Sequence, residues 1–374
     1  MNAGSRPYLW ALPAVPSTEV KDMKIHADFE CGNIRVLRED GCNIYLQNEM
    51  RGTTRDYCYW CFCVEGAQGK TLSFHLSMEW VGPFGAAVSH DLIHWHWMDS
   101  RDSGSEFTYH FREDEDVVYF AHDFVYTPRR FDAVVEELGL SVETLCLSPK
   151  GREVPCMRIG NGEKKLVLAS RHHSCESPGT YVLEGFLREY LINPIPNTSL
   201  FVVPFVDYDG VCDGDQGKGR PPYDHNRDYV AEPIYPEVKA IMGYAAENEV
   251  YMGYDFHSPS HSGGARCSKV FVVRKMVEKE PLFDQFGGIF EKNCTPDSMT
   301  YLVASDIHPN VGWNKDETPT FSTFFNRQPT CLFACTLETT FFGTEENKVS
   351  EDRLVNTGRV FCRSVQEFAE QTDR

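Results

Sequence analysis

An imidazole and a carboxylate three residues apart, His173 and Glu176, are the residues whose types and spacing most directly suggest chemistry. Both lie within the stretch 166–190, which reads LVLASRHHSCESPGTYVLEGFLREY. Nitrogen and carboxylate oxygen donors suit zinc, and a catalytic zinc site needs only three protein ligands. Because H-x-x-E pairs also arise by chance, the rest of the chain must decide whether this pair binds a metal.

The residues around this pair predict rigid elements that would hold it. The apolar run 166–169 has the length and composition of a buried strand, and it leads into a turn that carries His172 and His173. After Pro178 and Gly179, apolar residues recur at helical spacing, which predicts a helix over 180–191. Two histidines compete for the ligand position, and we favour His173 because only it has a glutamate three residues later.

The bulk composition limits the class of protein. With 374 residues, the chain is too long for one ordinary core, and we expect two domains. The formal net charge of −19 argues against a nucleic-acid partner. No apolar run approaches the about 20 residues needed to span a bilayer, so no membrane partner is expected. Residues 1–22 read as a loose leader, since their short apolar patch is broken by prolines and makes a poor signal peptide.

Cysteine and histidine clusters outside 166–190 offer competing metal sites. The 14 cysteines are scattered through strand-like and loop segments, which predicts mostly reduced thiols in a cytoplasmic protein. Cys58, Cys61 and Cys63 form a C-x-x-C-x-C run without a second cysteine pair, so we favour small buried hydrophobes over a metal site. For His94 and His96, packing of alternating strand side chains is likewise favoured over a metal site.

The sequence pattern changes near residue 128. Before it, short strand-like runs punctuated by glycine, asparagine and aspartate predict an N-terminal antiparallel β-sandwich domain over 23–127. After it, strand-like and helical segments alternate, which predicts an α/β catalytic domain over 128–374 with sites at strand ends. The expected strands are 34–36, 44–46, 57–64, 72–76, 86–88, 117–120, 156–159, 166–169, 199–206 and 250–256, and the expected helices are 130–138, 180–191 and 233–247.

Five motifs follow one another in the second half, and in this order they resemble the zinc metallocarboxypeptidases of the carboxypeptidase A superfamily, peptidase family M14. The closest likeness is to the cytosolic carboxypeptidase subfamily, whose members remove C-terminal and branched glutamates. Runs at 60–64, 66–70 and 114–117 also resemble the N-terminal sandwich of that subfamily. The motifs are R-x-H-x-x-E at 171–176, N-P-D-G-V echoed at 207–211, D-L-N-R at 224–227, D-[LF]-H at 255–257 and T-x-E-x-T-F at 336–341.

The resemblance implies a fold and a metal site. The fold is a carboxypeptidase-like mixed sheet flanked by helices, and one zinc per chain would be held by His173, Glu176 and His257. His261 competes with His257, which we favour because it alone has the aspartate and aromatic residue before it. Zinc would leave a fourth position for water, and Glu338 would be the general base that accepts the proton of that water and returns it to the leaving amine.

The resemblance also implies roles in substrate binding. Asn226 and Arg227 would bind the terminal carboxylate of the substrate, a task that suits the planar fork of arginine. Asp224 would orient one zinc histidine through its second ring nitrogen. His225 stands where the family usually has leucine, and we interpret it as a neighbour of the site rather than a ligand.

Two positions depart from the family pattern. The family places an arginine that stabilises the oxyanion ten residues before the arginine of D-L-N-R, and here that position is Gly217. Lys218 and Arg220 are close enough to replace this cation, and we rank Arg220 first. The family also places a tyrosine just before the catalytic strand, where this chain has Cys335, and no replacement is evident in the sequence.

These observations predict a cytoplasmic zinc metallocarboxypeptidase that hydrolyses the C-terminal peptide or isopeptide bond of peptides or proteins. Two alternatives stay open: a zinc amidohydrolase of the aspartoacylase type that acts on N-acyl amino acids, and a catalytically weak homologue that binds carboxylates. The N-terminal sandwich and the order of the motifs favour the carboxypeptidase over the amidohydrolase, whereas the missing oxyanion arginine is the only support for the weak homologue.

Overall fold

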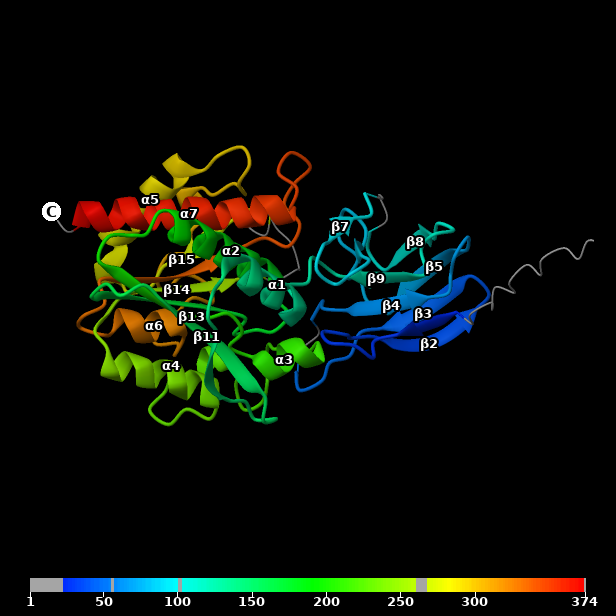
Figure 1. The fold of residues 1–374 in the computed structure, drawn as a ribbon, viewed down its shortest axis with the longest axis horizontal. Helices are drawn as coiled ribbons and strands as arrows, with labels where there is room; N and C mark the ends of the chain where they lie inside the picture. Colours follow the sequence, from blue (N-terminus) through cyan, green and yellow to red (C-terminus); the bar gives the residue numbers. More distant parts are fainter. Residues whose placement is uncertain (1–22, 55–56, 100–102, 260–267, 373–374) are drawn as a thin grey trace, which may run out of the picture.

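The computed structural model describes residues 23–54, 57–99, 103–259 and 268–372, and Figure 1 shows a smaller β-rich part beside a larger part of mixed structure. The expected leader 1–22 and the competing ligand His261 lie outside the described residues. A large mixed sheet flanked by helices follows two N-terminal sheets. The predicted fold class is therefore confirmed.

The smaller part is a sandwich of two sheets that close over aromatic side chains. Trp60, Phe62, Phe74, Phe107 and Phe120 are buried between the sheets and contact one another. The pairs are antiparallel, as expected, except that β3 and β5 run parallel. The five-stranded sheet has the order β1 (Lys24–His26), β4 (Cys61–Glu65), β9 (Val117–Ala121), β6 (Ala87–Ser89), β7 (His96–Trp97), and the four-stranded sheet has the order β2 (Arg35–Asp40), β3 (Asn43–Gln47), β5 (Thr71–Leu76), β8 (Glu106–His110).

The larger part is built on a seven-stranded sheet with a parallel centre. Strands β13, β12, β14 and β16 are parallel to one another, and β10, β11 and β15 pair antiparallel at the two edges. The predicted strand 199–206 ends at Val203, since Pro204 has no N–H to continue a ladder. The sheet order is β10 (Glu143–Leu147), β11 (Glu153–Ile159), β13 (Thr198–Val203), β12 (Lys164–Ser170), β14 (Val250–His257), β16 (Phe333–Glu338), β15 (Phe271–Val273).

Helices cover both faces of this sheet. In Figure 1, α2, α5 and α7 lie on one face, and α4 and α6 lie on the other. The predicted helices 130–138, 180–191 and 233–247 are confirmed as α1, α2 and α4, with shifted first residues. The helices are α1 (Pro128–Leu138), α2 (Ser177–Ile192), α3 (Tyr208–Asp213), α4 (Pro236–Glu247), α5 (Glu280–Asn293), α6 (Phe321–Asn326) and α7 (Glu351–Thr372), with short 3₁₀ turns η1 (His225–Arg227), η2 (Val277–Lys279) and η3 (Val303–Ser305).

Two close approaches of α2 depend on glycine. A Cβ on Gly185 would lie 1.9 Å from the Val355 carbonyl oxygen of α7, so the two helices pack backbone against backbone. A Cβ on Gly179 would lie 2.7 Å from the Phe256 carbonyl oxygen, at the end of β14. The first turn of α2 therefore reaches the end of β14, and this contact brings residues 173–176 close to residue 257.

One apolar cluster joins the two parts of the molecule. Trp97 of the sandwich packs against Phe342 with tilted rings whose centroids lie 5.5 Å apart, and its Nε1 donates a hydrogen bond to the Val349 carbonyl at 2.9 Å. Tyr59, Phe84 and Phe124 belong to the same cluster as the core around α2. The domain boundary near residue 128 stays a prediction, because the apolar packing is continuous across it.

The expected strand 57–64 begins later than predicted, at Cys61. The backbone before Cys61 forms hydrogen bonds with the larger part of the molecule instead of with a neighbouring strand. Tyr59 N donates to Gln216 Oε1 at 3.0 Å, and Gln216 Nε2 donates to the Tyr59 carbonyl at 2.8 Å. The sequence pattern alone could not exclude pairing for 57–60, because these residues are as aromatic as those of a buried strand.

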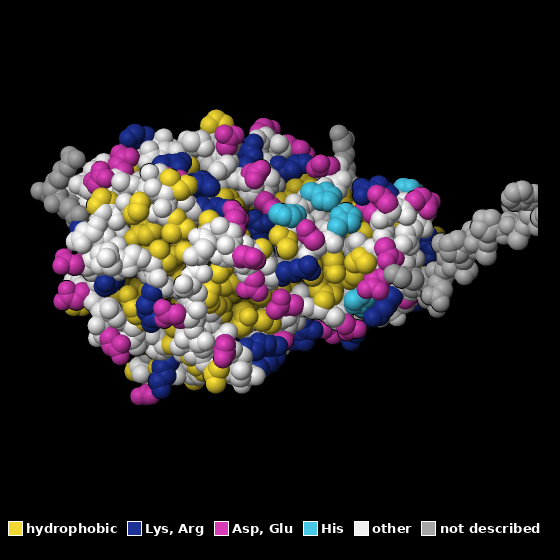
Figure 2. Space-filling model, viewed as in Figure 1, with side chains coloured by type: hydrophobic (Ala, Val, Ile, Leu, Met, Phe, Trp, Pro, Cys, Tyr) yellow, Lys and Arg dark blue, Asp and Glu magenta, His cyan; other side chains and the backbone are white. Residues whose placement is uncertain are grey.

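Charges of both signs on the surface and free thiols characterise the described part of the chain. Acidic and basic side chains are interspersed on the face shown in Figure 2, without a continuous basic stripe. All thirteen cysteines among the described residues are free. No helix within the described ranges is long and apolar enough to span a bilayer.

Candidate functional site

The candidate site lies where three adjacent parallel strands end. Strands β12, β14 and β16 are neighbours, and their carboxyl ends meet at one edge of the sheet. The chain leaves β12 at Ser170 and carries His173 and Glu176 on the turn before α2. His257 ends β14 and pairs in register with Glu338, which ends β16. Strand pairing therefore brings together four side chains from three distant segments.

His173, Glu176 and His257 form a compact group of nitrogen and oxygen donors. His173 Nδ1 lies 3.1 Å from Glu176 Oε1, and His257 Nδ1 lies 2.6 Å from Glu176 Oε2. One donor atom from each of the three residues lies within 4.8 Å of the others, and all three are buried. Two imidazole nitrogens and a carboxylate are a ligand set that catalytic zinc sites use.

The polar atoms of this group fit a bound cation. Among the described residues, His173 Nδ1 is buried without a hydrogen-bond partner, although it faces the carboxylate of Glu176. Although burial opposes it, the charges of Lys218, His173 and His257 hold the pKa of Glu176 well below its usual value. A buried ionised carboxylate beside an unpartnered ring nitrogen is an arrangement that a divalent ion would satisfy.

The second nitrogen of each ligand-candidate histidine faces an aspartate. His173 Nε2 lies 3.5 Å from Asp224 Oδ1, and His257 Nε2 lies 2.7 Å from Asp255 Oδ2. Asp255 also contacts His172 Nδ1 at 2.7 Å through its other oxygen, so His172 is bound away from the group. Aspartates in this position fix the ring orientation of metal-binding histidines. The role of Asp255 was missed from the sequence, where it could equally be a strand-end cap.

Glu338 is a buried carboxyl group with a free oxygen. It is 8% exposed, and its Oε2 has no hydrogen-bond partner among the described residues. Burial, together with the charge of Glu176, raises the pKa of Glu338 to about 6. A carboxyl group with a pKa raised in this way can accept and return a proton near neutral pH.

The structure favours Lys218 over Arg220 as the cation beside this group. Lys218 Nζ contacts Glu176 Oε1, and its side chain is 18% exposed. Arg220 instead binds Asp207 Oδ2 at 2.8 Å and Asp215 Oδ2 at 3.1 Å through Nη2. The oxyanion cation therefore stays a prediction, but the structure does not favour ranking Arg220 first, because two neighbouring carboxylates hold its guanidinium in an ion-pair cluster.

Asn226 and Arg227 both lie at the site, but different contacts hold their side chains. Asn226 Nδ2 lies 3.2 Å from Asp255 Oδ2 and 3.0 Å from His257 Nε2, and its Oδ1 accepts a hydrogen bond from Phe321 N. Its amide is thus occupied by the histidine–aspartate pair, which differs from the substrate-binding role expected for it. Arg227 donates from Nη1 to the Asn226 carbonyl and lines the open cavity.

A cavity of about 380 Å³ opens in front of these residues, and we call it the terminal cavity. Its charged lining is mainly basic, because Lys218, Arg227 and Lys275 face a single carboxylate, that of Glu338. Lys275 is 2% exposed and donates from Nζ to the Lys315 carbonyl at 2.7 Å. No sequence motif marks Lys275, which follows the short edge strand β15, so only the fold reveals it.

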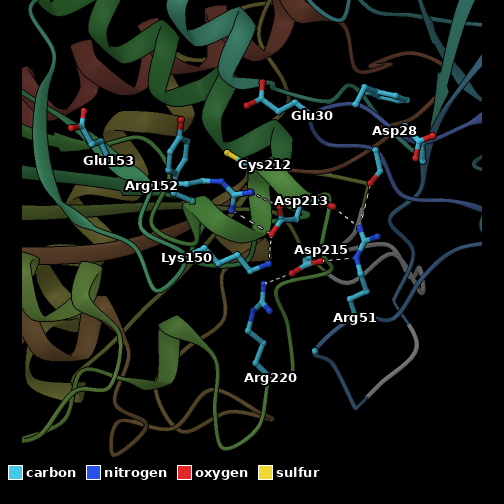
Figure 3. Close-up of a pocket in the computed structure, with 15 residues that line it drawn as sticks. Asp28, Glu30, Arg51, Lys150, Arg152, Glu153, Cys212, Asp213, Asp215 and Arg220 are labelled. Carbon is cyan, nitrogen blue, oxygen red and sulfur yellow. Dashed lines mark hydrogen bonds and ion pairs between the residues drawn. The ribbon is translucent and has the colours of Figure 1, made fainter.

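A larger cavity of about 1160 Å³ lies between the two parts of the molecule but carries a different chemistry (Figure 3). Its basic side chains are paired with aspartates: Arg152 Nη2 with Asp213 Oδ1 at 2.6 Å, and Arg51 Nε with Asp215 Oδ1 at 3.0 Å. Arg220 joins the same cluster. Since these charges neutralise one another, this cleft is a structural ion-pair network rather than the candidate site.

Neither the cysteine run 58–63 nor the pair His94 and His96 forms a metal-binding group by itself in the described part of the chain. Of Cys58, Cys61 and Cys63, only Cys63 belongs to a possible metal-binding group there, with His26 and Glu65. His94 and His96 belong to none.

Comparison with protein families and curated proteins finds similarity to cytosolic carboxypeptidases. Residues 25–122 match the family described as the cytosolic carboxypeptidase N-terminal domain. Cytosolic carboxypeptidase 2 of Xenopus tropicalis is 23% identical over 298 residues, which cover 70% of this chain and 30% of that protein. An uncharacterized protein of Zymomonas mobilis is 25% identical over 257 residues, covering 63% of this chain and 67% of that protein. The chain thus spans less than a third of the curated cytosolic carboxypeptidase it matches.

Solved structures share the fold over almost the whole chain. A metallo-carboxypeptidase from Burkholderia cenocepacia superposes with a TM-score of 0.78 at 18% identity, covering 94% of this chain and 100% of that one. A metallo-carboxypeptidase from Pseudomonas aeruginosa, solved with (2-guanidinoethylmercapto)succinic acid, gives a TM-score of 0.73 at 21% identity and covers 93% of this chain and 99% of that one.

Proposed function

Because this chain belongs to the M14 carboxypeptidase family, we propose that it is a zinc-dependent metallocarboxypeptidase that hydrolyses the C-terminal peptide or isopeptide bond of its substrates. One observation carries the proposal. The two histidines of a compact His–Glu–His group line one cavity together with Glu338, a carboxyl group of raised pKa, and two cations, Lys218 and Arg227. A donor set, a base and carboxylate-binding groups are the parts that this reaction requires.

His173, Glu176 and His257 would hold the zinc ion. Their donor atoms converge, and Asp224 and Asp255 support the two rings from behind. Zinc bound there would supply Lewis acidity that acidifies water and polarises the scissile carbonyl.

The remaining residues would move protons and hold charge. Glu338 would accept a proton from the attacking water and deliver it to the leaving amine, since it lines the same cavity and its Oε2 bonds to no described residue. Lys218 would donate a hydrogen bond to the oxygen that becomes negative as the carbonyl is attacked. Arg227 would bind the terminal carboxylate of the substrate through its planar guanidinium.

Zinc content and amino-acid release test the proposal together. We expect one zinc per purified chain and release of C-terminal amino acids that a chelator abolishes and added zinc restores. Peptides with an amidated C-terminus should resist cleavage, because Arg227 would have no carboxylate to bind. Hydrolysis of N-acyl amino acids without peptide trimming would contradict the proposal in favour of the amidohydrolase, and zinc without any turnover would favour a carboxylate-binding role.

The lining of the terminal cavity favours an acidic C-terminal residue. A terminal glutamate brings two carboxylates, and the cavity offers Arg227 for one and the buried ammonium of Lys275 for the other. Burial lowers the pKa of Lys275 to about 8 against the opposing charges of Asp316 and Glu317, so the ammonium is charged at neutral pH, but no described carboxylate lies within ion-pair distance to give it a direct counter-charge. A substrate carboxylate would supply that counter-charge.

Replacing Lys275 by methionine is expected to lower kcat/KM for peptides ending in glutamate by roughly 10- to 100-fold, as for a lost hydrogen bond between charged groups. Peptides ending in leucine should change by less than about threefold, since their side chains do not use the charge. In the wild type, the preference for glutamate over leucine should fall as pH rises through about 8, because Lys275 then loses its proton.

The control for this variant is Lys279→Met. Lys279 also donates from Nζ to a backbone carbonyl, that of Cys331 at 2.8 Å, but it does not line the terminal cavity. A glutamate-to-leucine preference that is the same in wild type and Lys275→Met would reject Lys275 as the selective group.

A further inference from the structure

We infer that Tyr57, from the N-terminal part of the chain, is a substrate-binding residue whose hydroxyl donates a hydrogen bond to the peptide carbonyl that precedes the scissile one. This inference rests on the proposed carboxypeptidase function and adds a residue that lies far in sequence from every motif of the site.

The position of Tyr57 between two cavities is the first support. A second cavity of about 400 Å³, which we call the entry cavity, adjoins the terminal cavity, and Tyr57 lines both of them together with His173, Lys218 and Arg227. If the terminal residue of a peptide occupies the terminal cavity, the preceding residues must leave through the entry cavity. Tyr57 therefore stands beside the peptide just upstream of the bond that is cut.

The chemistry of the side chain is the second support. Among the described residues, Tyr57 is the only tyrosine that lines the terminal cavity, and it is partly exposed. Its ring centroid lies 5.7 Å from Lys218 Nζ, the group proposed to stabilise the oxyanion. Its hydroxyl makes no hydrogen bond to any described residue. A phenol with a free O–H beside a basic group is a donor suited to a peptide carbonyl.

The backbone around Tyr57 is anchored to the loop that carries Lys218. The Tyr57 carbonyl accepts a hydrogen bond from Asn48 Nδ2 at 2.7 Å. On one side, Thr54 N donates to the Gly219 carbonyl at 3.2 Å, and on the other, Tyr59 exchanges two hydrogen bonds with the Gln216 side chain. The N-terminal segment and the loop 216–219 thus form one bonded unit, which holds the phenol at a set position relative to Lys218.

The experiment compares Tyr57→Phe with wild type, as full-length zinc-loaded enzymes, on N-acetylated and free dipeptides that end in the preferred residue. Only the acetylated dipeptide offers the carbonyl that Tyr57 would bind. We expect kcat/KM to fall roughly 10-fold on the acetylated dipeptide, as for one lost hydrogen bond, and less than about twofold on the free one. Zinc content and Tm should stay at the wild-type values, and Tyr57→Leu should show the same dependence on the acetyl group.

The matched control is Tyr223→Phe, because Tyr223 lines the entry cavity but not the terminal cavity. It should lower neither rate by more than about twofold, the range of a surface contact. Equal losses on both dipeptides, or no loss, would overturn the role of Tyr57 while leaving the carboxypeptidase function intact. A zinc-loaded wild type that releases no amino acid from any peptide would overturn both.

Discussion

Replacing Glu338 by glutamine is expected to lower kcat by at least about 10³-fold, within the range of a lost general base. The amide has nearly the same shape as the carboxyl group but cannot accept a proton. Glu338 ends β16 beside His257, is 8% exposed and lines the terminal cavity, and its Oε2 has no hydrogen-bond partner among the described residues. Burial and the charge of Glu176 raise its pKa to about 6, which places the base near the pH at which the enzyme would work.

The measurement is single-turnover release of the terminal residue, with zinc per chain determined on the same sample. Glu338 is not one of the three proposed ligands, so zinc content should equal that of the wild type. Glu237→Gln is the matched control: Glu237 is also a buried glutamate of raised pKa, but it lines a different cavity. A Glu338→Gln enzyme that keeps more than a tenth of wild-type kcat, with zinc bound, would remove the glutamate from the proposed chemistry.

Replacing Lys218 by methionine should lower kcat by about 10²- to 10³-fold, the cost of losing one oxyanion donor. Against the opposing effect of burial, the charge of Glu176 raises the pKa of Lys218, so the ammonium stays charged at any working pH. Because the interaction would strengthen only as negative charge develops on the carbonyl oxygen, the loss should appear in kcat more than in KM.

Two further variants separate this role from structural support. Lys218→Arg keeps a cation at the site and should recover part of the lost rate. Arg220→Met removes the cation that binds Asp207 and Asp215, so we expect it to lower Tm while changing kcat far less than Lys218→Met does. If Arg220→Met lost the greater part of kcat with an unchanged Tm, the assignment of the oxyanion cation would pass back to Arg220.

The parts of this protein that depend on local sequence could be predicted directly. A buried strand, a turn and an amphipathic helix around His173 and Glu176 follow from side-chain spacing, since hydrophobic periodicity reports which face of a segment is buried. The α/β fold after the sandwich was predictable for the same reason. The parallel β3–β5 pair was not, because local alternation does not determine the direction of the partner strand.

The site itself depends on contacts between segments that are distant in the chain. Strand register sets Glu338 opposite His257, and the close approach of Gly179 to β14 brings Glu176 to the same place. These are results of tertiary packing, which overrides the weak local preferences of each residue. The order of the motifs could predict that these residues meet at one site, but it could not predict the distances between them.

Charged groups near the site show most clearly how local sequence and tertiary structure differ in what they determine. In sequence, Lys218 and Arg220 are equivalent cations two positions apart, but folding gives Arg220 two aspartate partners and turns Lys218 toward Glu176. Lys275 and Tyr57 carry no motif and enter the cavity only because β15 and the N-terminal segment pack beside it. Residue types and spacing thus determined the fold class and the candidate donors. Tertiary structure decided which cation lies beside Glu176 and which residues line the cavity, since both depend on the distant residues that each side chain packs against.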